Sequence, residues 1–416
     1  MPSPLKALVV TAMALLLSHV AVYDLMDVSF FAPMQKASDF RFSDFYTLVA
    51  NDRAERVLDE NVVIVSVDGC NRAQMARAID DIDFCAPAAV GLDVAFNAPS
   101  EPDSDPLPES LASCENLVMP LELNEKGEIV YSYYDSIVTS SAGFACVNIQ
   151  GDKESRSTVR EFCSGFDVDG KFLPSLPMAL VSLADKEAAA QLRERNNAYE
   201  AINFVSRDFL VIPFDSIIDH ASDIEDRVVL VGKMKDIADT HSTPISNFTP
   251  GLSIHAYTIA TILSGDFTRR LSSFEMYLAA FILCFFVGWL NIVIGDTPLG
   301  SFGVRFVQLL LLYCMILIGT WAFVRYNVDL NFAYMMLTTS LCVVACDIYN
   351  GIFGDEGLIV KLQAYLVTVN EKISKIYESY KSKRALSSAV ADDPVDDNVI
   401  DCAGISEGLQ TEGRCD

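Results

Sequence analysis

Four runs of apolar residues divide the chain, at residues 5–22, 274–294, 306–324 and 332–349. A helix needs about 20 apolar residues to cross the hydrocarbon core of a bilayer, and the three later runs come close to that length. Backbone groups find no water there, so each run is predicted to be helical. Residues 24–272 have the more polar composition of a globular domain. The pattern predicts one folded domain tied to a membrane at both ends by four transmembrane helices.

The first run has two interpretations. It is shorter than the others and follows Lys6 directly, as the apolar region of a cleaved signal peptide would. Residues 19–23, however, read HVAVY and make a poor small-residue cleavage site. We therefore favour an uncleaved anchor over residues 1–23, with cleavage as the alternative.

Basic residues near the predicted spans indicate the orientation of the chain. Those that follow the last span are Lys361, Lys372, Lys375, Lys381, Lys383 and Arg384. This cluster favours a cytoplasmic C-terminus. Four spans then place the N-terminus in the cytoplasm as well and the long domain outside. Arg269 and Arg270, on the outer side of the second span, argue against this orientation.

Within the long domain, predicted strands alternate with predicted helices. The strands are expected at residues 61–68, 88–96, 117–120, 144–149, 201–204, 209–212 and 227–231, and the helices at 71–82, 107–114, 176–184 and 251–263. The run NVVIVSVD at 61–68 is almost continuously apolar, which is typical of a strand buried on both faces of a parallel sheet. The domain is therefore predicted to be α/β, with a mixed, largely parallel sheet and flanking helices.

Two of these strands end in a carboxylate, Asp68 and Asp93. Ligands of open α/β sheets bind at the carboxyl ends of the strands. If the two strands are neighbours, both side chains face one crevice. The alternative is that each aspartate caps the following helix or a turn.

Net charge and the remaining chemistry restrict the function further. The chain carries a net charge of −26, which opposes binding to the phosphates of nucleic acid. There is no Gly-rich phosphate loop and no convincing nucleophile arrangement. Asp239, His241 and His255 are conceivable metal ligands, but nothing places them on one face, and for His255 we expect a capping or packing role. We predict no cofactor, no metal and no catalytic residue.

The chain contains 11 cysteines. Those of the long domain are Cys70, Cys85, Cys114, Cys146 and Cys163. Disulfides are permitted outside the cytoplasm, and this odd number allows at most two internal bridges with one thiol left over.

The segment after the last span carries apolar residues at alternating spacings of three and four. They are Ile359, Leu362, Leu366, Val369, Ile373, Ile376 and Tyr380. Such a seam predicts a coiled coil that joins two copies of the chain. The alternative is a single amphipathic helix lying on the inner membrane surface. Residues 387–416 are rich in Asp, Ser and Gly and are predicted to form an acidic, disordered tail.

Seven short segments, taken in order, resemble a known family. They are VIVSVD at 63–68, VGLDVAF at 90–96, FLPSLPMA at 172–179, INF at 202–204, IPF at 212–214, DRVVLVG at 226–232, and TP at 243–244 with PGLSIHA at 250–256. Over roughly residues 30–265 they make the chain similar to the second type of CHASE domain, an extracytoplasmic sensor module of bacterial membrane receptors. Three spans directly after the domain are the usual arrangement of that family.

The resemblance implies a sensor that relays an outside signal to a cytoplasmic kinase, cyclase or similar output domain. The residues that align with recurrent positions of the family, and that we therefore predict to bind the ligand, are Asp68, Asp93, Thr243, Pro244 and His255. Residues 350–416 are too few for such an output domain. We therefore expect a non-enzymatic sensor that forms a homodimer and passes its signal to a separate cytoplasmic partner.

This interpretation divides the chain at fixed boundaries: an anchor at 1–23, a sensor domain at 24–272, three spans at 273–350, a cytoplasmic helix at 351–386 and a tail at 387–416. The location is the inner membrane of a bacterium, with the domain in the periplasm and both termini in the cytoplasm. The alternative is an assembly protein whose outer domain docks a protein partner instead of a small ligand.

Overall fold

The computed structural model describes residues 3–21, 41–99, 101, 104–136, 142–149, 157–295, 297–330 and 332–390. The chain divides into two compact units, Met1–Cys346 and Asp347–Asp416. The α/β domain and the apolar helices up to Cys346 belong to the first unit.

A seven-stranded sheet organises the domain, with the strand order β10-β1-β11-β2-β3-β4 and β5 also paired with β3. Its strands are β1 (Val57–Ser66), β2 (Ala89–Asp93), β3 (Leu117–Leu123), β4 (Ile129–Val130), β5 (Phe144–Cys146), β10 (Arg207–Pro213) and β11 (Val228–Gly232). Only the pairing of β3 with β4 is antiparallel. The predicted mixed, largely parallel sheet is confirmed.

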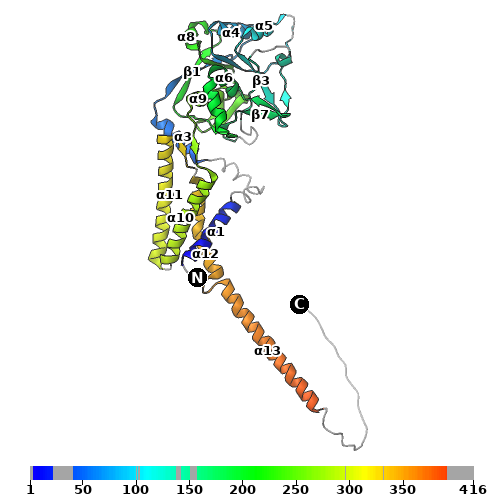
Figure 1. The fold of residues 1–416 in the computed structure, drawn as a ribbon, viewed down its shortest axis with the longest axis vertical. Helices are drawn as coiled ribbons and strands as arrows, with labels where there is room; N and C mark the ends of the chain where they lie inside the picture. The colour runs from blue at the N-terminus through cyan, green and yellow to red at the C-terminus, as the bar shows by residue number, and fades with distance from the viewer. Residues whose placement is uncertain are drawn as a thin grey trace, which may run out of the picture. The chain divides into compact units, whose positions relative to one another are not determined.

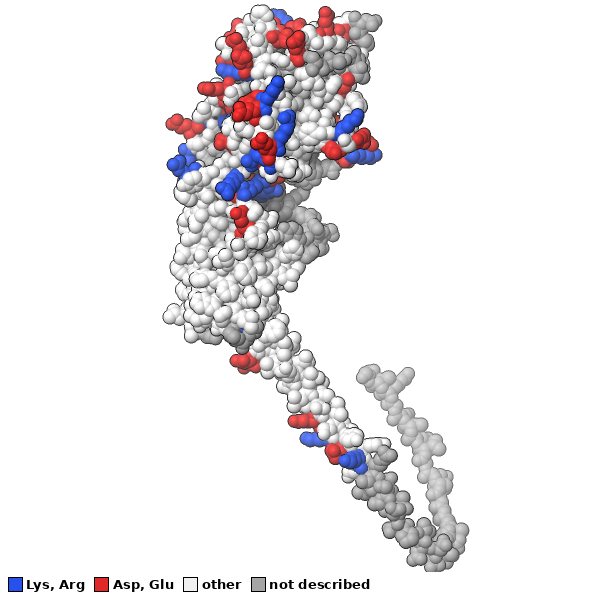
Figure 2. All heavy atoms as spheres, viewed as in Figure 1, with Lys and Arg blue, Asp and Glu red and all other residues white. Residues whose placement is uncertain are grey.

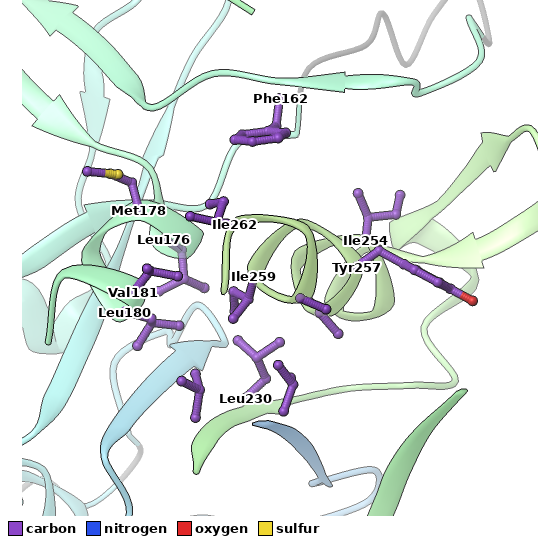
Figure 3. Close-up of a cluster of buried hydrophobic side chains, with 14 of the residues drawn as sticks. Phe162, Leu176, Met178, Leu180, Val181, Leu230, Ile254, Tyr257, Ile259 and Ile262 are labelled. Carbon is purple, nitrogen blue, oxygen red and sulfur yellow. The ribbon is translucent and has the colours of Figure 1, made fainter. Parts of the chain in front are cut away.

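Helices cover both faces of this sheet, and the central strands are buried on both sides. Along β1, Val62 and Ile64 face one core while Val63 and Val65 face the other. The first core is closed by α6 (Leu176–Ala184), α7 (Lys186–Arg195) and α9 (Gly251–Ser264), and the second by α4 (Arg72–Phe84), α5 (Leu107–Ser113) and α8 (Ala221–Ile224). Figure 1 shows α6 and α9 together, apart from α4, α5 and α8. Figure 3 shows α9 running through the first core beside Leu230 of β11.

Four small two-stranded sheets complete the domain. They are β6–β9 (Glu161–Phe162 and Glu200–Ala201), β7–β8 (Gly165–Val168 and Lys171–Pro174), β12–β13 (Thr240–Thr243 and Ser246–Pro250) and β14–β15 (Arg269–Arg270 and Val328–Asp329). The strand predicted at 201–204 is thus mostly irregular. Helix α3 (Phe42–Arg53), which packs on α11 (Pro298–Tyr326), was not predicted from the sequence.

Among the described residues, three helices are long and apolar enough to cross a membrane: α10 (Ser273–Ile294), α11 (Pro298–Tyr326) and α12, which begins at Phe332 and ends at Phe353. These agree with the three later predicted spans. Figure 2 shows their surface almost without charge, whereas acidic and basic side chains cover the α/β domain. Helix α1 (Ser3–His19) has 17 residues and is apolar but shorter than a full span.

Helix α1 packs lengthwise on α10 through small side chains. The buried residues of α1 recur every three or four positions and are Ala7, Val10, Thr11, Ala14 and Ser18. At Gly288 of α10, a Cβ atom would lie 3.5 Å from Val10 Cγ1 and 3.4 Å from Cys342 Sγ of α12. Small residues allow this close approach of three helices. The uncleaved anchor over residues 1–23 stays a prediction.

In the second unit, α13 (Leu358–Val390) is a 33-residue helix over the predicted cytoplasmic segment. It ends at Val390, so residues 387–390, which we expected in the tail, are helical. The rest of the predicted tail, 391–416, lies outside the described residues. Among the cysteines of the described part, the structure forms no disulfide.

Candidate functional site

Asp68 lies just beyond the end of β1 and fastens a neighbouring loop. Its carboxylate accepts hydrogen bonds from Ser66 Oγ at 2.7 Å and from the backbone nitrogens of Lys235 at 3.1 Å and Met234 at 3.3 Å. Burial acts to raise the pKa of Asp68, but these hydrogen bonds outweigh it and hold the pKa below its ordinary value. Asp68 does not cap α4, because Asn71 does so.

Asp93 ends β2, and a strand separates it from Asp68. The strand is β11, in which Gly232 pairs with Ser66 on one side and with Asp93 on the other. A Cβ atom at Gly232 would lie 2.9 Å from Leu252 Cδ1, so α9 fills the space above this glycine. The expectation of one crevice shared by Asp68 and Asp93 is therefore wrong, because β1 and β2 are not neighbours. Ligand binding by either residue stays a prediction.

His255 lies in α9 and is almost fully buried. Its Nε2 is 3.2 Å from Val147 O, to which it donates, and 3.9 Å from Asp93 Oδ2. Burial lowers the pKa of His255 to about 4, so the ring is neutral near pH 7. The expected packing role of His255 is confirmed, and it connects α9 to the segment that follows β5.

Thr243 and Pro244 lie at the turn of the β12–β13 hairpin. Thr243 Oγ1 is 2.9 Å from Thr249 Oγ1 and accepts from the Ser246 nitrogen at 3.2 Å, which closes the turn. In the same hairpin His241 Nε2 lies 3.3 Å from Asp239 Oδ1. Within the described ranges, no group of three or more His, Cys, Asp or Glu side chains could hold a metal ion. The structure thus places these residues in hairpin and helix packing.

A small pocket lies beside His255, between α9 and the segments around β5 and β6. Its free volume is about 20 Å³, room for about one water molecule. The side chains that line it are Asn148, Ile149, Glu161, Phe162, Cys163, Ser175, Pro177, Ile202, Ile254, His255 and Thr258. Of these, the sequence pointed only to His255.

Glu161 connects this pocket to the start of a membrane helix. Its Oε1 accepts from Arg41 Nη1 at 2.7 Å and from Arg270 Nη1 at 2.8 Å. Burial acts to raise the pKa of Glu161, but the charges of Arg270 and Arg41 outweigh it and lower the pKa. Arg270 stands three residues before Ser273, the first residue of α10. A displacement of Glu161 would therefore disturb its ion pair with Arg270 and so change the backbone segment that leads into α10.

Arg160, the neighbour of Glu161, holds a second helix. Its Nε and Nη2 both lie 2.7 Å from the carboxylate oxygens of Asp44 in α3, and both side chains are largely buried. Two parallel hydrogen bonds of this kind are strong and directional. Arg160 and Glu161 therefore bind both α3 and the segment just before α10. Figure 2 shows basic side chains gathered where the charged domain meets the uncharged helices.

A family model described as "CHASE2 domain" matches residues 9–290. The chain belongs to the CHASE2 family. No curated protein and no solved structure matches the chain significantly. CHASE2 is a family of extracytoplasmic sensor domains, which agrees with a membrane protein whose domain lies outside the cytoplasm.

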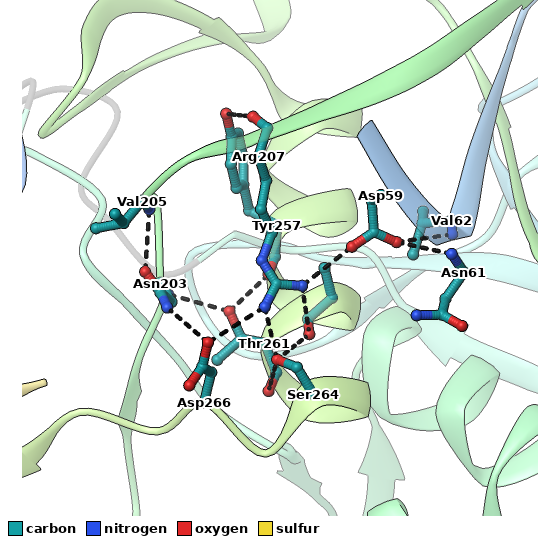
Figure 4. Close-up of polar contacts among 11 residues, drawn as sticks. Asp59, Asn61, Val62, Asn203, Val205, Arg207, Tyr257, Thr261, Ser264 and Asp266 are labelled. Atoms are coloured by element: carbon teal, nitrogen blue, oxygen red, sulfur yellow. Dashed lines mark hydrogen bonds and ion pairs between the residues drawn. The ribbon is translucent and has the colours of Figure 1, made fainter. Parts of the chain in front are cut away.

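The matched region extends beyond the α/β domain, from the middle of α1 into α10. The CHASE2 match therefore includes the connection between the sheet and the first apolar helix after it. Beside that connection lies a polar network centred on Arg207 (Figure 4).

Arg207 joins two strands of the CHASE2 domain to the end of α9. Its Nη1 is 3.0 Å from both Asp59 Oδ2 and Ala260 O, and its Nη2 is 2.7 Å from Ser264 Oγ. A guanidinium at the C-terminus of a helix also interacts favourably with the helix dipole. Asp59, at the start of β1, accepts from two backbone nitrogens as well. The last turn of α9 is thereby held to the edge of the sheet.

From this turn the chain leads directly to α10. Asp266 Oδ2 lies 3.4 Å from Arg207 Nη2, and Asp266 O accepts from Asn327 Nδ2 at 3.1 Å. Asn327 caps the end of α11, and its carbonyl accepts from the Arg269 nitrogen at 3.0 Å. The segment between α9 and α10 is thus tied both to the sheet and to α11.

Proposed function

We propose that this CHASE2 chain is a non-enzymatic membrane sensor that relays an outside signal to a separate cytoplasmic partner. The domain would lie in the periplasm of a bacterium, with both termini in the cytoplasm and two copies joined along α13. The observation that supports the proposal is that one residue in the wall of the pocket forms an ion pair just before the first long apolar helix. Ile254, His255 and Thr258 of α9 line the pocket, and Glu161 in its wall pairs with Arg270.

In this proposal, a ligand or partner acts through its different affinity for two arrangements of the entry to α10. Glu161 shares one oxygen between two arginines, so a change at the pocket wall alters both pairs together. The pocket as it stands has room for only about one water, so a larger ligand requires it to open. No step of this relay needs a nucleophile or a cofactor.

The experiment tests whether a change in the pocket wall alters the contact between two copies of α13. The full chain carries Ile373→Cys in the seam of α13, with Cys402 and Cys415 replaced by Ser, and the yield of cross-linked dimer is measured in membranes. We expect Glu161→Gln to change this yield, because it removes the charge that holds Arg41 and Arg270. Asp208→Asn is the matched control, since Asp208 pairs with Arg56 in an exposed ion pair.

An unchanged yield in Glu161→Gln would contradict the relay. So would an equal change in Asp208→Asn, because the effect would then not be specific to the pocket wall. Absence of any cross-link in the parent chain would contradict the homodimer along α13.

A second candidate function is docking of a protein partner. Two observations favour it: α9 fills the space between Asp68 and Asp93, and large apolar side chains stand exposed near that edge. Ile237 is 85% exposed and Phe248 is 77% exposed. Exposed apolar side chains of this size are typical of protein contacts when they form a patch. Purification under mild conditions separates the two functions: a stoichiometric protein partner supports docking, and a retained metabolite supports sensing.

A further inference from the structure

A cavity of about 220 Å³ lies at the outer end of α10, distinct from the pocket beside His255. The residues that line it are Arg269, Arg270, Leu271, Ser272, Glu275 and Val328. It is far roomier than the pocket in the sheet domain, which offers about 20 Å³. The β14–β15 pairing, Arg269 with Val328 and Arg270 with Asp329, fixes the backbone of the two arginines.

The charge of this cavity is positive in a strongly acidic chain. It holds two guanidinium groups against one carboxylate, that of Glu275, and the whole chain carries −26. Glu275 Oε2 accepts from the nitrogen and the hydroxyl of Ser272, both at 2.9 Å, so this carboxylate is engaged at the helix start. Arg270 shares Glu161 with Arg41. Arg269 makes no salt bridge among the residues that the structure describes, although its charge interacts with that of Glu275. The cavity therefore suits an anion.

The surroundings of the cavity suit an anion with an apolar tail. Helix α10 begins at Ser273, and its first two turns expose large apolar side chains: Phe274 is 75% exposed, Leu278 is 47% exposed and Tyr277 is 36% exposed. A Tyr side chain at the end of a span lies at the level of the lipid headgroups, as Tyr277 would. A ligand that placed its charge on the arginines would find apolar surface directly below.

We propose that this cavity binds the phosphate of an anionic phospholipid in the outer leaflet, with Arg269 as the main contact and Arg270 beside it. The acyl chains then lie along the exposed start of α10. The proposal rests on the membrane orientation of the proposed function, but not on the signal relay. The bound lipid holds the segment between α9 and α10, so membrane composition biases the same connection that the pocket wall controls.

The test uses the full chain purified in a mild detergent and supplied with phosphatidylglycerol or phosphatidylcholine. Retained lipid is counted by native mass spectrometry. We expect phosphatidylglycerol to be retained preferentially, and Arg269→Gln to weaken its retention about fivefold, the effect of one basic residue at an anionic surface. Arg325→Gln is the matched control: Arg325 is also exposed at the outer end of a span, but it does not line the cavity. Glu275→Gln is expected to strengthen retention.

Three results would overturn the proposal. Equal retention of the two lipids shows that the cavity does not recognise the negative charge. An equal loss of phosphatidylglycerol retention in Arg325→Gln shows that any basic residue at this end of the spans attracts the lipid and that the cavity is not a specific site. Displacement of the lipid by millimolar inorganic phosphate, with retention of that phosphate, shows a soluble phosphate site. None of these results bears on the cross-linking of α13, so failure here and failure of the relay are distinguishable.

Discussion

At the scale of single residues, the contact between Tyr46 and Gly319 shows how closely α3 fits α11. The Tyr46 ring lies tilted beside Phe323 of α11, at 5.9 Å between ring centroids, and its hydroxyl lies against Gly319. This hydroxyl is fully buried and has no hydrogen-bond partner among the described residues. Burial, with the nearby charge of Asp329, raises the pKa of Tyr46 to about 12. The site tolerates an unsatisfied hydroxyl because the ring itself is well packed.

We expect Gly319→Ala to destabilise the full chain by about 2 kcal/mol, because the new methyl group would overlap the Tyr46 hydroxyl. Gly303→Ala in the same helix is the control, since a Cβ atom there meets nothing within 4 Å. Tyr46→Phe should cost little, because it removes the unsatisfied hydroxyl. Thermal unfolding in detergent measures all three. Equal stability of the two alanine variants would show that α3 does not pack on α11 as described.

His255 makes the stability of the domain depend on pH. Its pKa is about 4 in the folded chain and near the ordinary 6.5 when unfolded. Between these values the unfolded chain binds the additional proton, so the free energy of unfolding falls as the pH drops from 6.5 towards 4. The slope is about 1.4 kcal/mol per pH unit for one proton, or about 3 kcal/mol over this range.

His255→Gln keeps a hydrogen-bond donor but cannot titrate. We expect it to flatten the pH dependence between 4 and 6.5, measured as the free energy of unfolding by pulse proteolysis of the full chain. His220→Gln, at a surface position, should leave the slope as it is in the parent chain. A slope unchanged in His255→Gln would mean that another group titrates there.

At the scale of secondary-structure elements, Arg207 decides whether α9 keeps its place on the sheet. Arg207→Leu would leave the nearly buried Asp59 without its charged partner, and such a loss costs about 3–5 kcal/mol. Arg56→Leu breaks the exposed pair with Asp208 and should cost less than about 1 kcal/mol. Chemical unfolding of the full chain separates the two values. Similar losses in both variants would contradict a structural role for the Arg207 network.

Most of these elements were predictable because their signals are local. The apolar run of β1 predicted a strand buried on both faces, and the structure alternates its side chains between two cores. Helix α4 begins where Asn71 provides a cap. The order of the strands was not predictable, because β11 enters between β1 and β2 from more than a hundred residues away along the chain. That insertion separates Asp68 from Asp93.

The candidate site was harder to predict than the fold. His255 was identified through a resembling segment, but Glu161 lies in a short strand with no motif around it. One signal was present in the sequence: Arg269 and Arg270 stand on the predicted outer side of a span, against the usual distribution of basic residues. The structure pairs Arg270 with Glu161 and places both arginines in the lining of a cavity. The unusual position of these two arginines was thus the sequence feature that best indicated the connection between the domain and the apolar helices.

At the scale of the whole molecule, the function depends on whether α13 joins two chains. Its apolar side chains stand exposed in the single chain: Leu366 is 56% exposed, Ile373 is 58% exposed and Ile376 is 69% exposed. They belong to the seam of Leu362, Leu366, Val369, Ile373, Ile376 and Tyr380 predicted from the sequence. A helix of 33 residues with such a seam gains most of its stability from a partner surface. The partner is a second α13 or the inner face of the membrane.

Replacing Val369 and Ile373 together by Asp separates these possibilities. In a coiled coil each introduced charge would be buried in the seam without a partner, which costs several kcal/mol. We therefore expect dimerisation to weaken at least about 100-fold, so that the full chain in detergent changes from dimer to monomer. Ser374→Asp, which lies outside the seam, should leave the dimer intact. Light scattering coupled to size exclusion measures the mass. A parent chain that is monomeric in detergent would instead favour a helix lying on the membrane, and the signal would then have to leave the chain by a single copy. A dimer that survives the double substitution would show that the two copies meet outside the seam of α13.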